Sequence, residues 1–355
     1  MRLPQVLQLS VVGLLVVLAF GLVWAWGGSS GALGSGFQPV PGKGVVYVTR
    51  LEQDGAILKV RSLTQGVFDF DTIAKVNYPS NILCGLDGRL YVIEGFARDG
   101  NREVHRILRF NQDGSGRTVV AQWNTSVLRP GAMVFAPNGD LYFGTASTVI
   151  GRPHKGVWRI PGVLQAENFF NPPEQILTPE FFTPPPLGMG AGANPYAFLT
   201  TGAFVGDLLI MDKPRYFVGS TAGPENPGTR VLRASKPNFN TVTEFIPRLT
   251  PRPVDHDDDG GLAINSQGDV FMTDMTNGKV LRYNPDGTFV GVFAEVQTAG
   301  QIAIGPDDIV YVTNVTFPPG GPAGGGLFIF DPEGKLLAKS GFPIALYGVT
   351  VCAPQ

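Results

Sequence analysis

Residues 258–287 read DDGGLAINSQGDVFMTDMTNGKVLRYNPDG, and this stretch decides the fold. It contains short apolar runs separated by turn residues, at 262–264, 270–272 and 280–283, with a fourth run possible at 288–293. Asn277-Gly278 has the composition of a two-residue type I′ hairpin turn, which needs residues that tolerate a positive φ. Four short antiparallel strands with tight reversals describe one blade of a β-propeller.

The same unit recurs along the chain as an apolar run, a turn and a second run that contains a large apolar residue. That residue marks each unit, and we call the six of them the marker residues: Tyr47, Tyr91, Tyr142, Leu209, Phe271 and Tyr311. The shortest separations between markers match the ~40–50 residues that one blade occupies. The sequence therefore predicts an all-β fold, a six-bladed β-propeller with four-stranded blades.

The two ends of the predicted domain are incomplete units. Residues 44–48 form a second strand with no first strand before it, and residues 344–351 form a first strand with nothing after it. An open propeller would leave unpaired sheet edges at both ends. We therefore predict that the C-terminal strand pairs into the N-terminal blade and closes a propeller that spans residues 44–352.

The N-terminal residues 1–26 have the composition of an export signal. Residues 7–26 carry no charge and are almost entirely apolar, and Arg2 precedes them. Val23-Trp24-Ala25 offers a small-residue cleavage site for a signal peptide, but the stretch is also long enough to span a bilayer as a hydrophobic helix and serve as a signal anchor. In both cases the positive-inside rule delivers the rest of the chain to the periplasm or the extracellular space, after a Gly/Ser/Pro-rich linker at 27–43.

The composition narrows the range of partners. Charged residues make up 16% of the chain and the formal net charge is −2, so no basic stripe points to nucleic acid. We expect a monomer that meets the membrane only through its N-terminal segment. Export would permit a disulfide between Cys84 and Cys352, but their side chains would have to meet across two packed blades, so we expect buried, unpaired cysteines.

Long connections fall mainly into two classes. In a propeller, the connections between blades and those between second and third strands lie on one face, and the long segments nearly all belong to these classes: 95–103, 146–155, 162–194, 213–228, 247–258 and 315–325. Functional loops gather in this way on a rigid scaffold, which predicts a ligand-binding face, although insertions are also tolerated there without function. The longest connection, 162–194, is rich in phenylalanine. These rings either pin the loop to the propeller rim or form an apolar wall of a ligand cleft.

The repeats at 261–274 and 301–314, with Val-Leu-Arg-Tyr-Asn-Pro-Asp-Gly at 280–287, resemble the NHL repeat and the related senescence-marker-protein/gluconolactonase and streptogramin-lyase propellers. The resemblance covers most of residues 44–352. Gluconolactonase-like members bind a divalent cation in the central channel through carboxylate and amide side chains near the start of first strands. The corresponding positions here are Ser80, Gly131, Gly260 and Gly300, none of which is a carboxylate. The resemblance therefore does not carry over a metal site.

Streptogramin lyases use histidines on the loop face, and His256 lies at the entrance of a predicted first strand. Neighbouring carboxylates favour the protonated form of a histidine, so His256 and Asp257 are candidate catalytic residues. Asp255, Asp258 and Asp259 are candidate ligands for Ca²⁺ or another divalent cation. The alternative is a solvated acidic turn without chemistry.

Polar residues near strand ends are candidate ligand-binding residues: Asn81, Glu94, Asn194, Tyr196, Asp212, Asp274 and Asn314. Four of them lie three residues after a marker residue, namely Glu94, Asp212, Asp274 and Asn314. These four can equally be turn caps, because Asp and Asn side chains bond local backbone amides.

Two functions follow from these observations. The first is an exported propeller that binds a small molecule, a glycan or a protein on its long-loop face. The alternative is a metal-assisted lactone hydrolase or lyase whose site lies at the mouth of the central channel. The absence of carboxylates from the expected ligand positions favours the first, because a hard cation needs several oxygen ligands.

Overall fold

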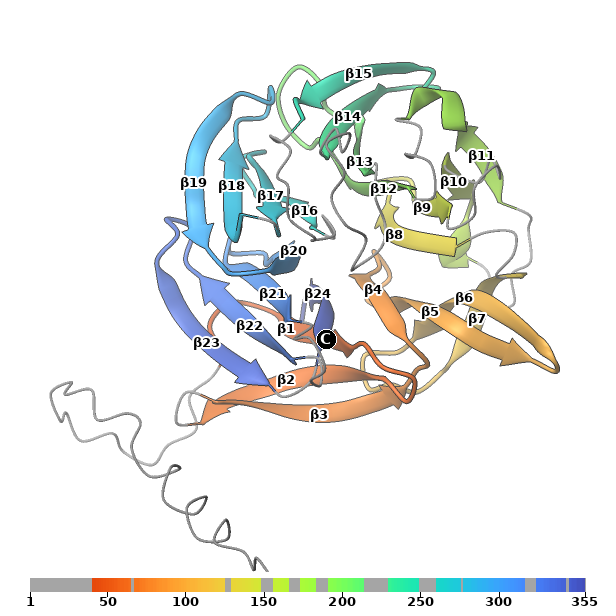
Figure 1. The fold of residues 1–355 in the computed structure, drawn as a ribbon, viewed down its shortest axis with the longest axis vertical. Helices are drawn as coiled ribbons and strands as arrows, with labels where there is room; N and C mark the ends of the chain where they lie inside the picture. Colours follow the sequence, from red (N-terminus) through yellow and green to blue (C-terminus); the bar gives the residue numbers. More distant parts are fainter. Residues whose placement is uncertain are drawn as a thin grey trace, which may run out of the picture. The chain divides into compact units, whose positions relative to one another are not determined.

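The computed structural model describes residues 40–64, 67–124, 129–147, 156–165, 173–182, 191–213, 229–248, 260–275, 277–316, 324–342 and 345–354. Their strands form six antiparallel blades around an axis, as Figure 1 shows. From the axis outward the strand orders are β24-β1-β2-β3 (blade A), β4-β5-β6-β7 (B), β8-β9-β10-β11 (C), β12-β13-β14-β15 (D), β16-β17-β18-β19 (E) and β20-β21-β22-β23 (F). The predicted six-bladed, four-stranded propeller is confirmed.

The strand bounds are β1 Val45–Arg50, β2 Ala56–Thr64, β3 Val67–Lys75, β4 Pro79–Cys84, β5 Leu90–Asp99, β6 Arg102–Phe110, β7 Thr118–Asn124, β8 Arg129–Phe135, β9 Leu141–Ser147, β10 Gly156–Ile160, β11 Glu174–Leu177, β12 Ala191–Phe198, β13 Leu208–Lys213, β14 Arg230–Ser235, β15 Thr241–Ile246, β16 Leu262–Ile264, β17 Val270–Asp274, β18 Lys279–Tyr283, β19 Phe289–Glu295, β20 Ala299–Ile304, β21 Val310–Thr316, β22 Gly324–Phe330, β23 Leu336–Phe342 and β24 Leu346–Cys352. Short 3-10 helices cover Val163–Gln165 and Pro179–Phe181. The described part of the chain holds no helix that is long and apolar enough to cross a membrane. The predicted signal at 1–26 and most of the linker at 27–43 lie outside the described residues.

Packing between neighbouring blades explains why a large side chain recurs at the marker position of every unit. Each lies in the second strand of its blade and is almost fully buried, with no marker more than 3% exposed. Each also belongs to the apolar cluster between its own blade and the next, as Tyr91 does between blades B and C. Since blades diverge from the axis, a wedge opens between neighbours, and a large side chain fills it at the packing density of a protein interior.

Two details of the sequence prediction were wrong. The reversal at Asn277-Gly278 is wider than a two-residue hairpin: Gly278 N bonds Met275 O, and of the two residues only Gly278 has a positive φ. The segment 162–194 is not a single connection, because it contains β11, the fourth strand of blade C. Its sequence Glu-Gln-Ile-Leu is too short and too polar to stand out as a strand. Phe181 and Phe182 pack against the cluster between blades C and D, while Phe169 and Phe170 lie outside the described residues.

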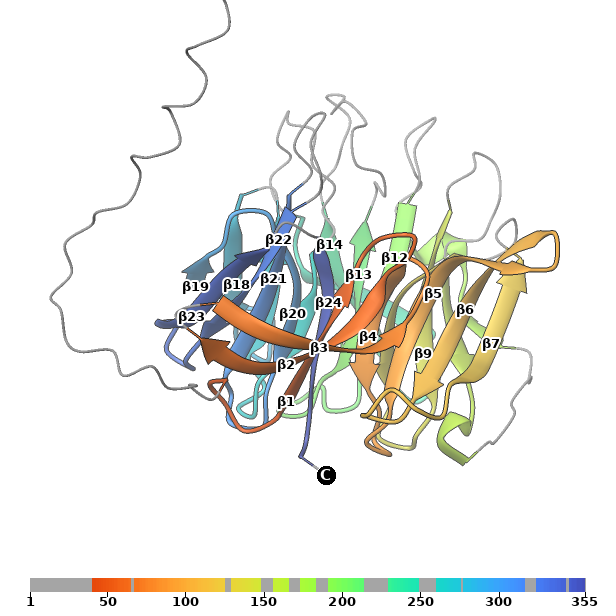
Figure 2. The same ribbon diagram turned by 90° about the horizontal axis from the view of Figure 1, so that it is seen from below.

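The C-terminal strand closes the ring, as predicted. β24 pairs with β1 in the register Val45↔Cys352, Tyr47↔Thr350 and Val48↔Val349. It becomes the innermost strand of blade A, beside β1 near the axis in Figure 1, and the C-terminus emerges at the lower face in Figure 2. Blades C and D are joined in addition by two residue pairs between β9 and β12, Ser147↔Ala191 and Ala146↔Gly192.

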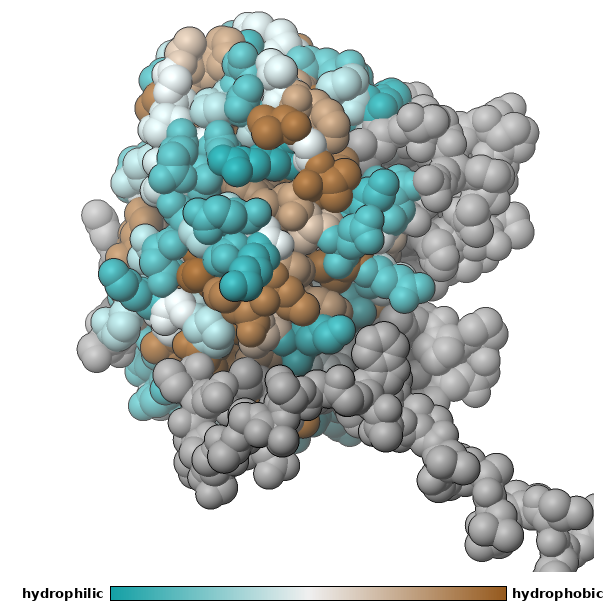
Figure 3. All heavy atoms as spheres, turned by 90° about the vertical axis from the view of Figure 1, so that its left-hand side faces the viewer, coloured by the Kyte–Doolittle hydropathy of each residue, from teal (hydrophilic) through white to brown (hydrophobic). Residues whose placement is uncertain are grey.

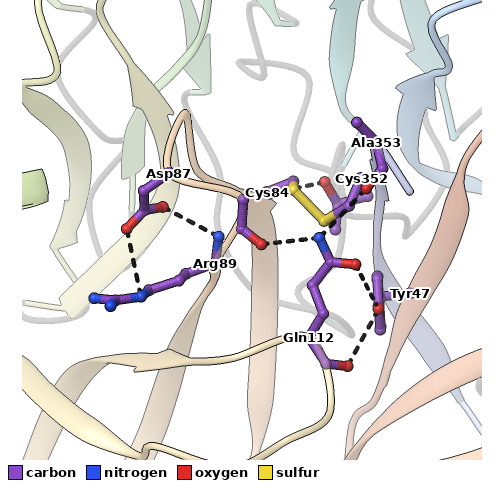
Figure 4. The surroundings of a disulfide bond; sticks show 9 residues. Tyr47, Cys84, Asp87, Arg89, Gln112, Cys352 and Ala353 are labelled. Atoms are coloured by element: carbon purple, nitrogen blue, oxygen red, sulfur yellow. Dashed lines mark hydrogen bonds and ion pairs between the residues drawn. A yellow bond between two sulfur atoms is a disulfide. The ribbon is translucent and has the colours of Figure 1, made fainter. Parts of the chain in front are cut away.

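Cys84 and Cys352 form a disulfide, so the expectation of unpaired cysteines was wrong (Figure 4). They lie on innermost strands of the neighbouring blades A and B, and their Cα atoms are 5.5 Å apart. Innermost strands converge on the axis, so side chains there meet although the blades separate farther out. The bond ties the closing strand β24 covalently to blade B.

A buried glutamine supports the same joint from the β6–β7 turn. Gln112 Nε2 donates to Gly88 O (2.9 Å) and to Ala353 O (3.4 Å), and its Oε1 accepts from Tyr47 Oη (3.1 Å) (Figure 4). Burial, with a smaller contribution from the charge of Asp113, raises the pKa of Tyr47 to about 12. The phenol therefore stays protonated and remains a hydrogen-bond donor at every physiological pH.

Three threonines, each two residues after a marker, link one blade to the next. Thr313 Oγ1 accepts from Gln301 N of its own blade (3.1 Å) and donates to Tyr347 O of blade A (2.6 Å). Thr273 connects blade E to F and Thr49 connects blade A to B in the same way, by donating to Gly300 O (2.6 Å) and Ser80 O (2.8 Å). These contacts form an unbroken run from blade E through F and A to B, across the closure.

The outer strands present sheet edges to solvent. Large exposed apolar side chains of β19 and β23 are Phe289, Val290, Val292, Leu336 and Leu337. The side of the molecule that carries these strands faces the viewer in Figure 3, where apolar side chains lie in small groups among polar ones. Interrupting the apolar surface in this way limits edge-to-edge association.

Reducing the disulfide should destabilise the propeller. The bond joins residues 268 positions apart, and loss of such a cross-link costs about 2–5 kcal/mol of unfolding free energy. In urea denaturation we expect a lower midpoint after addition of reductant. A Cys84→Ser/Cys352→Ser double variant should show that lower midpoint with or without reductant. Equal midpoints for the oxidised and reduced wild type would contradict the bond's role.

Removing one threonine hydroxyl should weaken the closure. Thr313→Val keeps the shape of the side chain but leaves buried backbone groups without that partner, at a cost of about 1–3 kcal/mol. The matched control is Thr72→Val on the exposed surface of β3, which should leave stability within about 0.5 kcal/mol of wild type. Equal denaturation midpoints for both variants would show that the threonine links contribute nothing.

Candidate functional site

The central channel is lined by residues from all six innermost strands. It encloses about 330 Å³, and its walls are mostly apolar, with Ile82, Met133, Leu262, Ile302 and Val349 among them. The polar side chains that line it are Asn81, Tyr196, Thr200, Gln301 and Thr350. An apolar pocket with a few convergent polar groups is the usual form of a small-molecule site.

A network of hydrogen bonds spans the mouth of this channel on the face of the blade-to-blade connections. Tyr196 Oη donates to Gly260 O (2.9 Å), and Gln301 Nε2 donates to Tyr196 Oη (3.3 Å). Lys213 Nζ donates to the same carbonyl of Gly260 (3.0 Å) and lies 5.9 Å from the centre of the Tyr196 ring. We call Tyr196, Lys213, Gly260 and Gln301 the channel-mouth network.

Lys213 is unusual because its side chain is almost completely buried, with 1% of its surface exposed. It is the last residue of β13, the second strand of blade D, and it reaches Gly260, two residues before β16 of blade E. A buried ammonium is stable only with hydrogen-bond partners. Lys213 therefore fixes the boundary between blades D and E and places a positive charge beside the mouth.

Asn194 of β12 carries a buried oxygen that the described residues leave without a hydrogen bond. The side chain is 2% exposed, and Oδ1 has no donor within bonding distance. It rests against Gly131 of β8, where an added Cβ would lie 2.3 Å from Oδ1. An unsatisfied buried acceptor costs about 1–3 kcal/mol, and nearly all such groups in native proteins have a partner. A hydrogen-bond donor that reached this oxygen would recover that free energy.

Asn81 of β4 is also buried and lines the channel, but its oxygen is used. Oδ1 accepts from Met133 N of β8 (3.3 Å), which links blade B to blade C. The structure thus places three of the predicted ligand-binding residues on innermost strands around the axis: Asn81, Asn194 and Tyr196. Two of them also hold blade boundaries together.

The other four predicted ligand-binding residues lie in second strands, and each has a partner in its own blade or in the connection that leads to it. Glu94 pairs with Arg106 and Arg117 (both 3.4 Å), and Asp212 pairs with Arg230 (2.8 Å). Asp274 accepts from Asn277 N (3.0 Å) and Asn314 donates to Gln297 O (3.3 Å). Among the contacts named here, only that of Asp274 is to a local backbone amide, as in a turn cap.

The acidic segment with His256, Asp255, Asp257, Asp258 and Asp259 lies outside the described residues. Within the described ranges, no three His, Cys, Asp or Glu side chains come together as a metal site. The free oxygen of Asn194 is a suitable ligand for a hard cation, but the buried charge of Lys213 is close to the mouth. The described side chains alone do not make up a divalent-cation site, which needs several oxygen ligands.

Sequence reasoning did not include Lys213 among the site residues, and it considered Gln301 only as a residue one position away from an expected cation-ligand position. Gln301 precedes Ile302 as Asn81 precedes Ile82, so an amide occupies the same register in two first strands. Lys213 follows Asp212 at the end of an apolar run, where charged residues normally indicate a solvent-exposed strand end.

No family model matches the sequence, and no curated protein matches it. Among solved structures, the chain is similar to a gluconolactonase from Xanthomonas campestris, with 14% identity, a TM-score of 0.49 and coverage of 89% of this chain and 91% of that one. It is also similar to a calcium-binding protein, regucalcin, from Agrobacterium tumefaciens, with 10% identity, a TM-score of 0.47 and coverage of 74% and 73%.

Proposed function

We propose that the protein binds a small, hydroxyl-bearing molecule at the mouth of its central channel. The observation that carries this proposal is the buried Oδ1 of Asn194, which has no hydrogen bond within the described part of the chain. A ligand hydroxyl that donates to this oxygen would recover the free energy that the unsatisfied acceptor costs.

The surrounding groups favour the same ligand chemistry. Tyr196 and Gln301 both donate and accept hydrogen bonds, as a hydroxyl group does. The channel of about 330 Å³ is at the small end of ligand pockets and offers apolar walls to the carbon skeleton of a bound molecule. Polyols and small sugars combine these properties.

The same proposal includes export. Residues 7–26 are uncharged and nearly all apolar, behind Arg2, which is the pattern of a signal peptide or signal anchor. The propeller would then act outside the cytoplasm, as a secreted or membrane-anchored binding protein and as a monomer.

A metal-assisted lactone hydrolase or lyase is the second candidate. One observation favours it, because an amide oxygen such as that of Asn194 is also a ligand that Ca²⁺ accepts. This candidate needs further oxygen ligands from Asp255, Asp258 or Asp259, with His256 and Asp257 as acid and base. Among the described residues that line the channel, none is an aspartate, a glutamate or a histidine.

We expect Asn194→Leu to weaken ligand binding at least about 10-fold, because the replacement removes the acceptor. D-glucose, D-gluconate and D-glucono-1,5-lactone are suitable probes in isothermal titration calorimetry, the last because the similar Xanthomonas protein is a gluconolactonase. Gly131→Ala should have a comparable effect, since its Cβ would displace the Asn194 amide. The matched control is Asn238→Ala in the exposed β14–β15 turn of the same blade.

Equal affinities for wild type and Asn194→Leu would contradict the proposal, as would the absence of binding by all three probes. Lactone turnover that disappears with a chelator and returns with Ca²⁺ would instead favour the enzyme. If Asp258 is a ligand of the cation, the Asp258→Asn variant should lose this Ca²⁺-dependent turnover.

A further inference from the structure

A second cavity lies on the loop face between blades A and B. It has a volume of about 1100 Å³ and shares no residue with the central channel. One wall consists of the β1–β2 turn and the connection from β3 to β4, at residues 53–55 and 75–78. The other wall is the β5–β6 hairpin, which projects from the ring in Figures 1 and 2.

A β-bulge shapes the second wall. The register of β5 against β6 shifts between Glu94 and Ala97, so Gly95 and Phe96 together lie opposite His105 and β5 contains one extra residue. Asn77 holds them in place by donating its Nδ2 to Phe96 O (2.8 Å) and to Gly95 O (3.3 Å). Bulges redirect side chains and are common beside functional sites. Here the Phe96 side chain lines the cleft and remains 37% exposed.

Two aromatic residues with strained backbones meet at this cleft. Tyr78 has φ 41° and Phe96 has φ 49°, in the left-handed region that bulky residues rarely adopt. Their ring centres are 5.6 Å apart with an interplanar angle of 76°, and Phe96 also packs edge-on against His105 at 5.3 Å. Strained backbone conformations of this kind persist only where the surrounding structure holds them in place. They are concentrated at active sites and ligand-binding sites.

The charges around the rings are balanced. Positive groups at the cleft are Lys75, Arg98 and Arg106, and negative groups are Asp54, Glu94 and Glu103. Gln53 and Asn77 add amides that both donate and accept. This balance disfavours a polyanion or polycation and favours a neutral ligand with many hydroxyl groups. The aromatic rings would contact its C–H surfaces, as aromatic residues do in many ligand pockets.

We propose that this cleft binds a neutral oligosaccharide, with one sugar ring packed on Phe96. The volume of about 1100 Å³ exceeds the ~300–1,000 Å³ of typical small-molecule pockets, so the site suits several sugar units. The cleft is partly open to solvent, which allows a bound chain to extend beyond it. This site is independent of the small-molecule site at the channel mouth.

Titration calorimetry with maltohexaose, cellohexaose and xylohexaose tests the proposal on the full propeller with its disulfide intact. At least one hexasaccharide should bind, and Phe96→Ala should weaken it at least about 10-fold, or 1.4 kcal/mol. Phe96→Tyr should retain binding, because the ring remains. Gln53→Ala on the opposite wall should also weaken binding, which keeps the proposal testable if Phe96→Ala does not fold.

Two controls separate this site from the rest of the protein. Phe289→Ala removes an equally large but more exposed ring, 56% exposed, from the outer strand of blade E and should not change the affinity. Asn194→Leu should leave hexasaccharide binding intact. A wrong proposal for the channel mouth can therefore be told apart from a wrong proposal for the cleft between blades A and B. No binding of any hexasaccharide at millimolar concentration would overturn the proposal, and so would equal affinities for wild type and folded Phe96→Ala.

Discussion

The pairing of β24 with β1 is the interaction on which the rest of the structure depends. It brings together two strands from opposite ends of the propeller, and the entropy cost of such closure grows only slowly with chain length. In return, β24 completes blade A and contacts both neighbours: Tyr347 O accepts from Thr313 of blade F, and Cys352 is bonded to Cys84 of blade B. Without β24, the boundary between blades F and A would lose the bond from Thr313 to Tyr347 O, the boundary between A and B would lose the disulfide, and the apolar clusters beside Tyr47 and Tyr311 would open.

Every blade boundary carries a link of backbone or side-chain hydrogen bonds, and two of the side chains that make these links, Asn81 and Tyr196, also line the channel. Threonines serve E to F, F to A and A to B; Asn81 serves B to C; strand pairing serves C to D; Tyr196 and Lys213 serve D to E. Asn194 is different because its buried oxygen has no such use among the described residues. The two proposed sites therefore have different origins: the channel mouth follows from ring closure, whereas the cleft between blades A and B follows from a local bulge and two strained aromatic residues.

Much of the fold could be predicted from the sequence, because the wedge between blades demands a large residue at one position of each second strand. Tyr47 and Tyr311 located blades A and F, and the incomplete end units predicted the closure. Contacts between blades could not be predicted, since they depend on distance from the axis. Cys84 and Cys352 meet only because innermost strands converge. The short strand β11 lacked a pattern, and the strained φ of Phe96 left no sign in the sequence. Of the residues at the proposed channel-mouth site, Asn81, Asn194 and Tyr196 were among the sequence candidates, but the buried Lys213 was not.

Native-state hydrogen exchange of the β24 amides tests the central claim most directly. If closure is part of the global fold, β24 and β1 should exchange with a free energy within about 1 kcal/mol of that for the buried strand β21 of blade F, because all open together. The account would be contradicted if the β24 amides exchanged through a local opening whose free energy is several kcal/mol lower than that of β21. The closing strand would then be a detachable end, and the channel would not depend on it.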